Sequence, residues 1–279
     1  MNTNQQKVLK YYQSIESRFG YENVTGEIKH FGYYPKNRKN ITEKKAQMLM
    51  TDLVAKNLKL KPNQLVLDAG CGYGVVSCYL AEKYGANLFG IDINKYEIGK
   101  ARERAKNMGL SKKVHFEVTD YTQTNFPKNH FDSIFTLETL SHSPDLEKTL
   151  KGFLRILKTG GKVTFFEYTL TPDKDFSPWE LKMLNIGIEG TAALGLKEFE
   201  HDKFPQYLKN IGFKNVKEQN ITKNMLPSIG RLKRLATAPY FFIKLFGLQK
   251  YFVNATIAVE WYKLWKKGLV RYCIFTAEK

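Results

Sequence analysis

The chain has 279 residues, 43% of them hydrophobic and 25% charged, which is typical of a globular protein and excludes a disordered or collagen-like chain. Its formal net charge is +17, and its length allows one large domain or two small ones. Only three cysteines are present, the start resembles no signal peptide, and no apolar run approaches the roughly 18 residues of a spanning helix. We therefore expect a protein that is cytoplasmic or peripheral on a membrane.

The first 62 residues are expected to form a helical cap. Their net charge is +7, and they contain a loop, Gly26–Asn40, that is rich in Tyr, Lys and Gly. Residues 222–279 carry a further +9, so almost all of the excess positive charge flanks a nearly neutral central part. Such basic flanks suit nucleic acid, an anionic membrane or an anionic substrate.

The central residues, 63–221, alternate short apolar runs with longer periodic segments, which is the pattern of a parallel sheet with helical crossovers. The first predicted strands are apolar or β-branched: Gln64–Asp68, Asn87–Ile91, Val114–Thr119, Asp132–Thr136 and Lys162–Tyr168. Helices are predicted between them at Val75–Tyr84, Lys95–Met108 and Leu146–Leu157, the last ended by the glycines that follow. The periodicity falters over Thr171–Gly195, and a helix near Asp202–Ile211 and a strand near Asn215–Ile221 follow.

Residues 222–269 form a basic and aromatic stretch that we expect to be a helical lid, followed by a final strand of the core over 270–279. From 224 to 269 there are eight Lys or Arg and one acid, Glu260. Prolines and glycines at four positions favour short amphipathic helices over one long helix. Three roles stay open: an ordinary lid, a lid that lines an oily pocket and contacts an anionic membrane, and, least favoured, a nucleic-acid surface.

The sharpest motif is Val66-Leu-Asp-Ala-Gly-Cys-Gly-Tyr-Gly74, between a predicted strand and a predicted helix. Its glycines allow a ligand to approach the backbone closely, and the helix start offers unpaired N–H groups. The glycine spacing differs from that of dinucleotide-binding loops, which disfavours a dehydrogenase. Asp68, directly before the loop, is unsuited to a pyrophosphate and suits a cationic or zwitterionic ligand.

Acidic residues also end the next two predicted strands. Asp92 lies 20 residues beyond Gly72, where a carboxylate can accept hydrogen bonds from both hydroxyls of a ribose. Asp120 can accept from the exocyclic amine of adenine, with Tyr121 flanking the ring. Together these carboxylates predict an adenosine site at one edge of the sheet.

These residues resemble the class I S-adenosylmethionine-dependent methyltransferases, most closely over residues 60–170. The resemblance implies an α/β fold, a seven-stranded, doubly wound Rossmann-like sheet with an antiparallel final strand and helical lid insertions. It implies S-adenosylmethionine as cofactor and assigns these residues to its site: Tyr11, Tyr12, Asp68, Gly70, Gly72, Gly74, Asp92, Ile93, Asp120, Tyr121 and Leu137. No metal is expected, because no Cys/His cluster has zinc spacing.

Other segments are similar to small-molecule methyltransferases of the sterol, tocopherol and glycine/sarcosine type. Tyr11-Tyr-Gln-Ser-Ile15 and His30-Phe-Gly-Tyr-Tyr34 match their N-terminal pattern, and Glu138-Thr-Leu-Ser-His-Ser-Pro144 is similar to a segment of sterol C-24 methyltransferases. The candidate catalytic residues are therefore Glu138, His142, His30 and Tyr34. Glu167, which ends the fifth predicted strand, is a further candidate for the pocket.

The predicted reaction is methyl transfer to a hydrophobic small molecule, with C-methylation of a sterol- or terpenoid-like acceptor as the first choice. Methylation of an alkene generates positive charge, which calls for a carboxylate or aromatic face and for a proton acceptor. Two alternatives stay open: O- or N-methylation of a small natural product or amine, and an RNA-binding methyltransferase that uses the basic flanks. A nucleic-acid substrate is disfavoured because Thr136-Leu-Glu-Thr139 replaces the motif of amino-methylating enzymes and no cysteine follows a proline.

Overall fold

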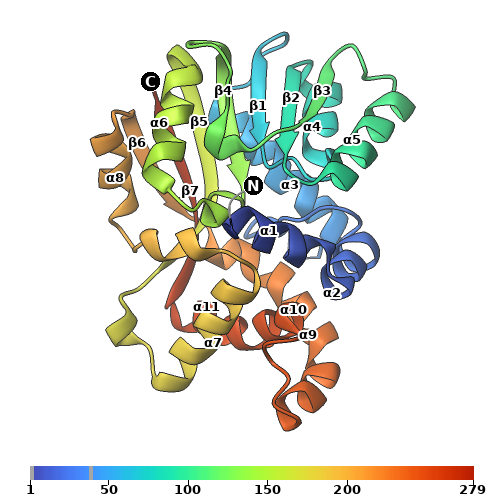
Figure 1. Cartoon of the computed structure of the whole chain (residues 1–279), viewed down its shortest axis with the longest axis vertical. Coiled ribbons are helices and arrows are strands. Elements are labelled where there is room, and N and C mark those ends of the chain that lie inside the picture. The colour runs from blue at the N-terminus through green and yellow to red at the C-terminus, as the bar shows by residue number, and fades with distance from the viewer. Residues whose placement is uncertain (1–2, 38–39) are drawn as a thin grey trace.

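The computed structural model describes residues 3–37 and 40–279, whose strands form one seven-stranded sheet in the order β3-β2-β1-β4-β5-β7-β6 (Figure 1). β7 pairs antiparallel with both β5 and β6, while the pairs among the first five strands are parallel. The strands are β1 Leu65–Ala69, β2 Asn87–Asp92, β3 Val114–Val118, β4 Phe131–Leu137, β5 Leu157–Leu170, β6 Lys214–Asn220 and β7 Val270–Glu278. The predicted doubly wound sheet with an antiparallel final strand is confirmed.

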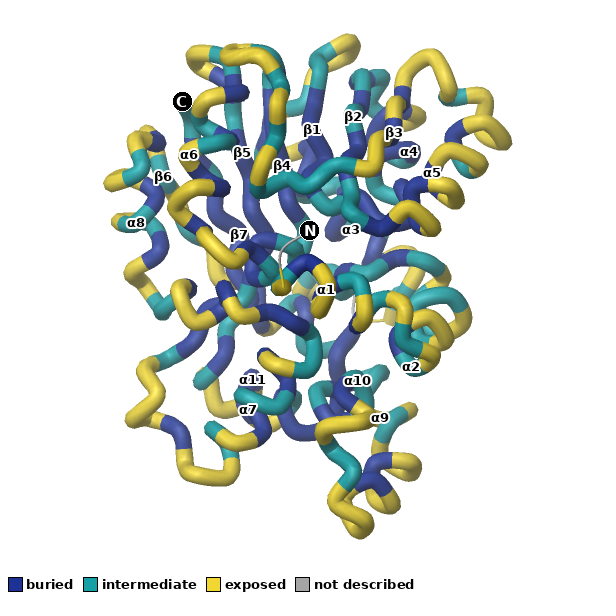
Figure 2. Tube along the Cα trace, in the orientation of Figure 1, coloured by how far each residue is buried: buried dark blue, intermediate teal, exposed yellow. Residues whose placement is uncertain are grey.

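Helices cover both faces of this sheet, which explains why its central strands are almost continuously apolar. One group consists of α3 Glu43–Leu58, α4 Val75–Tyr84 and α5 Lys95–Asn107, and the other of α6 Leu146–Ile156 and α8 Phe204–Ile211. Figure 2 shows the strands buried between them and the exposed residues at the periphery. No helix among the described residues is both long and apolar enough to cross a bilayer.

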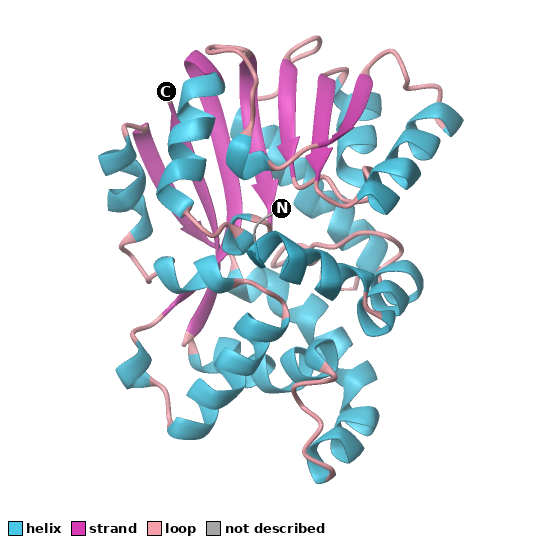
Figure 3. Ribbon diagram, viewed as in Figure 1, coloured by secondary structure: helices cyan, strands magenta, loops and turns pink. Residues whose placement is uncertain are grey.

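The remaining helices gather below the carboxyl ends of the parallel strands, where the arrowheads point in Figure 3. They come from both ends of the chain and from the segment after β5: α1 Thr3–Gln13, α2 Ile15–Phe19, α7 Pro178–Gly190, α9 Thr222–Leu245, α10 Val253–Thr256 and α11 Tyr262–Lys267. The carboxyl edge of a parallel sheet is where ligands bind in such folds, so these helices enclose the candidate site.

The glycines after Lys158 do not end α6 as predicted. α6 ends at Ile156 because Leu157 already has an extended backbone, with φ −73° and ψ 136°, and pairs with Phe131 of β4. The glycines therefore lie inside β5, where Gly160 has φ +73°. Strand pairing, rather than the glycine signal, determines where this helix ends.

The prediction of short helices is wrong for the first half of the 222–269 stretch. α9 runs without interruption over 24 residues, through Pro227 and Pro239. Each proline removes one backbone hydrogen bond, but Met225, Ile229 and Ile243 on the inner face are buried, and this packing outweighs the loss. The second half does consist of shorter pieces, α10, a π-helical turn and α11.

Candidate functional site

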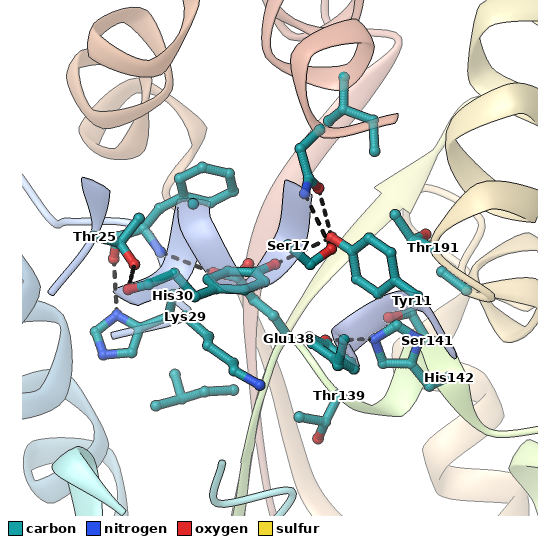
Figure 4. A pocket seen from close by; sticks show the side chains of 18 of the residues that line it. Tyr11, Ser17, Thr25, Lys29, His30, Glu138, Thr139, Ser141, His142 and Thr191 are labelled. Carbon is teal, nitrogen blue, oxygen red and sulfur yellow. Dashed lines mark hydrogen bonds between the residues drawn. The ribbon is translucent and has the colours of Figure 1, made fainter. Parts of the chain in front are cut away.

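A cavity of about 450 Å³ lies between the carboxyl edge of the sheet and the helices below it. Most of the predicted site residues line it, namely Tyr11, Tyr12, His30, Gly70, Asp92, Ile93, Asp120, Tyr121, Leu137, Glu138 and His142. Five predicted residues do not line it: Tyr34, Asp68, Gly72, Gly74 and Glu167. Figure 4 shows His30, Glu138 and His142, which come from separate segments of the chain, around this cavity, with Glu138 between the two histidines.

The glycine loop that follows β1 is packed too tightly for other residues. Gly70, Gly72 and Gly74 all have positive φ angles, +91°, +50° and +70°. A Cβ atom on Gly70 would lie 2.5 Å from Cγ2 of Thr139, and one on Gly74 would lie 2.5 Å from the ring of Phe116. Only glycine therefore allows this loop to lie flat against the sheet, with Gly70 facing the cavity.

Asp92 and Asp120 present carboxylates to the cavity, and backbone groups fix the orientation of both. Oδ2 of Asp92 accepts from the N–H of Gly72 at 3.0 Å, and Oδ1 accepts from the N–H of Asn94 at 2.9 Å. Oδ1 of Asp120 accepts from the N–H of Thr122 at 2.8 Å. Oδ2 of Asp120 also accepts from the hydroxyl of Thr122 at 2.8 Å and from the side-chain amide of Gln5. Both oxygens of Asp92 and Oδ1 of Asp120 keep a further lone pair. These acceptors fit a group with a ribose and an exocyclic amine.

Asp68 acts below the loop rather than in the cavity. It is buried, and its Oδ2 accepts from the hydroxyl of Ser77 in α4 at 2.7 Å. Burial raises the pKa of Asp68 to about 7, although the bond from Ser77 opposes the shift. The position of this side chain links β1 to α4 and supports the glycine loop from behind.

Lys29, which the sequence analysis did not single out, places a cation among tyrosine rings at the cavity wall. Its ammonium lies 2.5 Å from Oε2 of Glu97, 3.9 Å from the ring centre of Tyr12, and 5.2 Å from those of Tyr21 and Tyr73. Burial raises the pKa of Glu97 to about 7 against the effect of Lys29. Lys29 therefore adds a cation to the cavity wall beside the glycine loop, balanced by Glu97 and held over the tyrosine rings.

His142 lies in a short 3-10 turn after β4 and contacts the N-terminal helix. Its Nε2 is 3.0 Å from the hydroxyl of Tyr12, and its Nδ1 is 3.3 Å from the carbonyl of Ala192. Burial lowers the pKa of His142 to about 4, so the ring is neutral near pH 7. A neutral ring satisfies both contacts when Nδ1–H donates to Ala192 and Nε2 accepts from Tyr12.

Glu138 carries the most unusual geometry in the site. Its φ angle is +58°, which turns its half-buried carboxylate toward three donors. Oε1 accepts from the N–H of Phe31 at 3.0 Å and from the hydroxyl of Tyr272 at 2.8 Å, and Oε2 accepts from the hydroxyl of Tyr168. Burial raises the pKa of Glu138 to about 7 against these bonds, so this carboxyl exchanges a proton near neutral pH.

Aromatic rings surround the carboxylate of Glu138. The ring centres of Phe31 and Trp265 are 5.8 Å apart, and those of Tyr168 and Tyr272 are 5.3 Å apart. Phe31, Tyr168 and Trp265 also line the cavity. The negative faces of such rings and an ionised carboxylate both stabilise positive charge on a ligand.

The other catalytic candidates are held by contacts elsewhere. His30 is buried, with Nδ1 3.0 Å from the carbonyl of Phe31, and burial lowers its pKa to about 4. The hydroxyl of Tyr34 donates to Glu43 in α3 at 3.0 Å. Glu167 accepts from the N–H of Leu140 at 2.6 Å, and burial raises its pKa to about 8, but it does not line the cavity.

Comparison with known proteins gives consistent results. A family model for the methyltransferase domain matches residues 67–165. The sequence is 32% identical, over 99% of this chain and 95% of the relative, to the S-adenosyl-L-methionine-dependent Diels-Alderase of Talaromyces variabilis. It is 29% identical, over 74% of this chain and 53% of the relative, to the sterol 24-C-methyltransferase of Yarrowia lipolytica. The solved cyclase SpnF has the same fold, with a TM-score of 0.77 and 22% identity over 100% of this chain and 97% of that one.

Proposed function

This chain belongs to the class I S-adenosylmethionine-dependent methyltransferases of small molecules, and from that premise we propose that it methylates a carbon atom of a hydrophobic, sterol- or terpenoid-like acceptor. The observation that carries the proposal is the half-buried Glu138 carboxyl, which lines the cavity among aromatic side chains. A carboxyl with a pKa of about 7 beside aromatic faces is suited to alkene methylation, which generates positive charge and then releases a proton.

The cofactor supplies an electrophilic methyl group on a positively charged sulfur. Asp92 would hold its ribose, Asp120 its adenine, and the backbone at Gly70 its amino-acid part. Tyr11 and Tyr12 of α1 close the cavity over this edge of the sheet, since Tyr11 donates to Asn254 at 2.6 Å and Tyr12 contacts His142. These contacts exclude water and align the two reactants, which contributes much of the catalysis in a transfer of this kind.

On the acceptor side, the protein supplies the proton acceptor and the charge-stabilising faces. Ionised Glu138 takes a proton from the carbon skeleton, and the rings of Phe31, Tyr168 and Trp265 stabilise the positive charge that precedes this step. Trp261, Ile229 and Leu232 also line the cavity, which favours an apolar acceptor. The neutral ring of His142 is a second base, better suited to O- or N-methylation of a small acceptor.

A second candidate function is a cofactor-dependent cycloaddition, and one specific observation favours it. The Diels-Alderase matches this chain over nearly its whole length, whereas the sterol methyltransferase matches over about half of its own. A cycloaddition forms two carbon–carbon bonds with no net proton transfer. Glu138 would then position the substrate without exchanging a proton.

The two functions are separated by exchanging the cofactor for its demethylated product. We expect an isoprenoid or sterol alkene to be converted with S-adenosylmethionine, with one S-adenosylhomocysteine released per product, and not to be converted with S-adenosylhomocysteine alone. Formation of an isomer of the substrate with either cofactor would establish the cycloaddition instead. Turnover of water-soluble amines or phenols, with none of apolar alkenes, would refute the hydrophobic acceptor.

A further inference from the structure

The end of α9 and the turn that follows it expose a cluster of large apolar side chains. Phe241, Phe242, Leu245, Phe246 and Tyr251 have exposed fractions between 59% and 67%, and we call this set the α9 tip. It forms the lower extremity of the molecule in Figure 1, and Figure 2 shows this extremity mostly as exposed. A contiguous exposed group of this kind is uncommon in a soluble monomer and marks an interaction surface.

The α9 tip is not the inner face of the helix. Tyr240 and Ile243, on the opposite side of the same turns, are already buried and pack with Val259. The hydroxyl of Tyr240 donates to Glu260 at 3.0 Å, which fixes this end of α9 against the chain that leads into α11. The helix end is therefore apolar on both sides, with one side packed in the fold and the other facing outward.

Charge indicates what the outward side contacts. Residues 222–259 contain six Lys or Arg and no Asp or Glu. Lys244 and Lys250 lie between residues of the α9 tip in the sequence, and the ammonium of Lys250 is 5.0 Å from the ring centre of Tyr251. Aromatic and aliphatic side chains flanked by lysines match the boundary between anionic headgroups and acyl chains. A second copy of this chain would bring the same positive charges together and fits less well.

The same helix connects the α9 tip with the cavity. Leu232, Leu235 and Pro239, earlier along α9, line the cavity. Leu235 is also 56% exposed, and Phe19 of α2 both lines the cavity and is 63% exposed. These two side chains both line the cavity and face the surface, so they lie at its rim.

We propose that the α9 tip inserts into the surface of an anionic membrane and brings the rim of the cavity to the bilayer from which the acceptor is drawn. The docking itself is independent of the reaction, whereas the delivery step rests on the proposed hydrophobic acceptor. Lys263 and Lys267, which also belong to the basic stretch, contribute little, because they are paired with Glu260 at 2.7 Å and with Glu180 at 2.6 Å.

The docking is tested by sedimentation of the full chain with vesicles, without cofactor or acceptor. We expect binding to vesicles of phosphatidylcholine and phosphatidylserine, weak binding to pure phosphatidylcholine, and loss of binding as salt increases. Replacement of Phe241, Phe242 and Phe246 by Ser should lower the partition coefficient about tenfold or more. Lys244→Gln and Lys250→Gln should each lower it about fivefold at low salt.

The matched control is a Met108→Ser, Lys112→Gln double variant, which loses one exposed apolar residue and one lysine near the end of α5, far from the α9 tip. This variant should bind vesicles like the parent. Equal vesicle binding by the triple Phe variant would overturn the proposal. The proposal would also be overturned if the parent does not bind vesicles but forms a concentration-dependent dimer, or binds RNA, and the triple Phe variant does not.

The delivery step is tested by comparing the triple Phe variant on two forms of one acceptor. Turnover should fall when the acceptor is embedded in anionic vesicles and stay unchanged when it is dispersed in detergent. If the triple Phe variant turns over the vesicle-embedded acceptor as fast as the detergent-dispersed acceptor, relative to the parent, the delivery step is refuted. If neither the parent nor the variant methylates any lipid, the proposed function fails, and vesicle binding still decides the docking on its own.

Discussion

Glu138, directly after β4, combines two properties that lower the stability of the folded protein. Its left-handed backbone is unfavourable for a residue with a Cβ, by roughly 1–3 kcal/mol, and its carboxyl is half-buried at the cavity wall. The bonds from Phe31, Tyr168 and Tyr272 hold both features in place. Conformational strain that a fold maintains in this way is typical of functional positions.

The pKa of Glu138 predicts the pH dependence of methyl transfer. Only the ionised carboxyl accepts a proton, so kcat should increase as pH rises through about 7 and level off above it. His142, with a pKa of about 4, is neutral throughout this range and adds no further pH-dependent rise or fall in kcat. We call the rise of kcat through pH 7 the limb of the profile. The measurement is kcat at saturating cofactor between pH 5.5 and 9, a window that spans roughly 1.5–2 units on each side of that pKa.

Two variants show whether this limb belongs to Glu138. Glu138→Gln should lower kcat by about 10²–10⁴-fold and remove the limb. Tyr272→Phe removes a bond that favours the ionised carboxyl, so the limb should move to higher pH. An unshifted limb in Tyr272→Phe, or an unchanged profile in Glu138→Gln, would assign the titration to another group and the catalytic role with it.

Asp92 predicts a loss of cofactor affinity that is separate from catalysis. Asp92→Ala should weaken S-adenosylhomocysteine binding by about 1.5–3 kcal/mol, roughly 10–150-fold, because a charged acceptor for two hydroxyls is lost. Calorimetric titration measures this effect, and Glu138→Gln serves as the control that should bind the cofactor almost normally. An unchanged affinity in a folded Asp92→Ala protein would refute the adenosine site.

The residues of the site differ in how far the sequence predicts them. Asp92 and Asp120 both line the cavity, as expected of strand-end carboxylates in a parallel sheet, which meet at one edge. Asp68 shares that pattern, yet it points to Ser77 below the loop. Lys29 escaped notice because its partners, Glu97 and three tyrosines, come from other segments of the chain, and only the tertiary structure brings them together.

At the scale of elements, α7 controls the shape of the cavity through one glycine. A Cβ atom on Gly187 would lie 2.5 Å from Cζ2 of Trp261, which lines the cavity and donates to the carbonyl of Met183 at 3.2 Å. Gly187→Ala would therefore displace the indole into the space for the acceptor. We expect a higher KM for the acceptor with an unchanged Kd for S-adenosylhomocysteine, measured by kinetics and calorimetry.

Gly99→Ala is the matched control, because Gly99 lies inside α5 with nothing within 4 Å of its absent Cβ. That change should leave both constants unaltered and raise stability by about 0.5–1 kcal/mol. If Gly187→Ala also leaves both constants unaltered, the indole of Trp261 moves without entering the cavity, and α7 does not shape the acceptor site.

The elements of the sheet were predictable, whereas those that enclose the cavity were only partly so. Short apolar runs predict buried strands, and β1, β2 and β4 follow this rule. β3 alternates buried and exposed residues in its first half. α7 was missed, although Ser177-Pro-Trp-Glu180 carries the capping box that the structure shows. α9 was divided by its prolines in the prediction, because packing of its inner face is invisible in the local sequence.

At the scale of the whole molecule, the charge and the cavity favour one arrangement. The nearly neutral sheet domain binds the cofactor, and the basic residues before and after it contribute to the helices on the open side of the cavity. An enzyme of this form would meet its acceptor at an anionic surface and carry out the reaction in a cavity closed by α1. The sequence predicted the basic flanks but not the α9 tip, because exposure is a property of the folded chain.

The claim that the cavity joins the cofactor to a hydrophobic acceptor is tested most directly by following the methyl group. Lipid extracts and purified isoprenoids are incubated with the full chain and S-adenosylmethionine that carries a trideuterated methyl group, and products are analysed by mass spectrometry. The account predicts an apolar product that acquires this label on carbon and that nearly disappears with Glu138→Gln. Conversion of an apolar substrate to an unlabelled isomer, or label found only on water-soluble compounds, would contradict it.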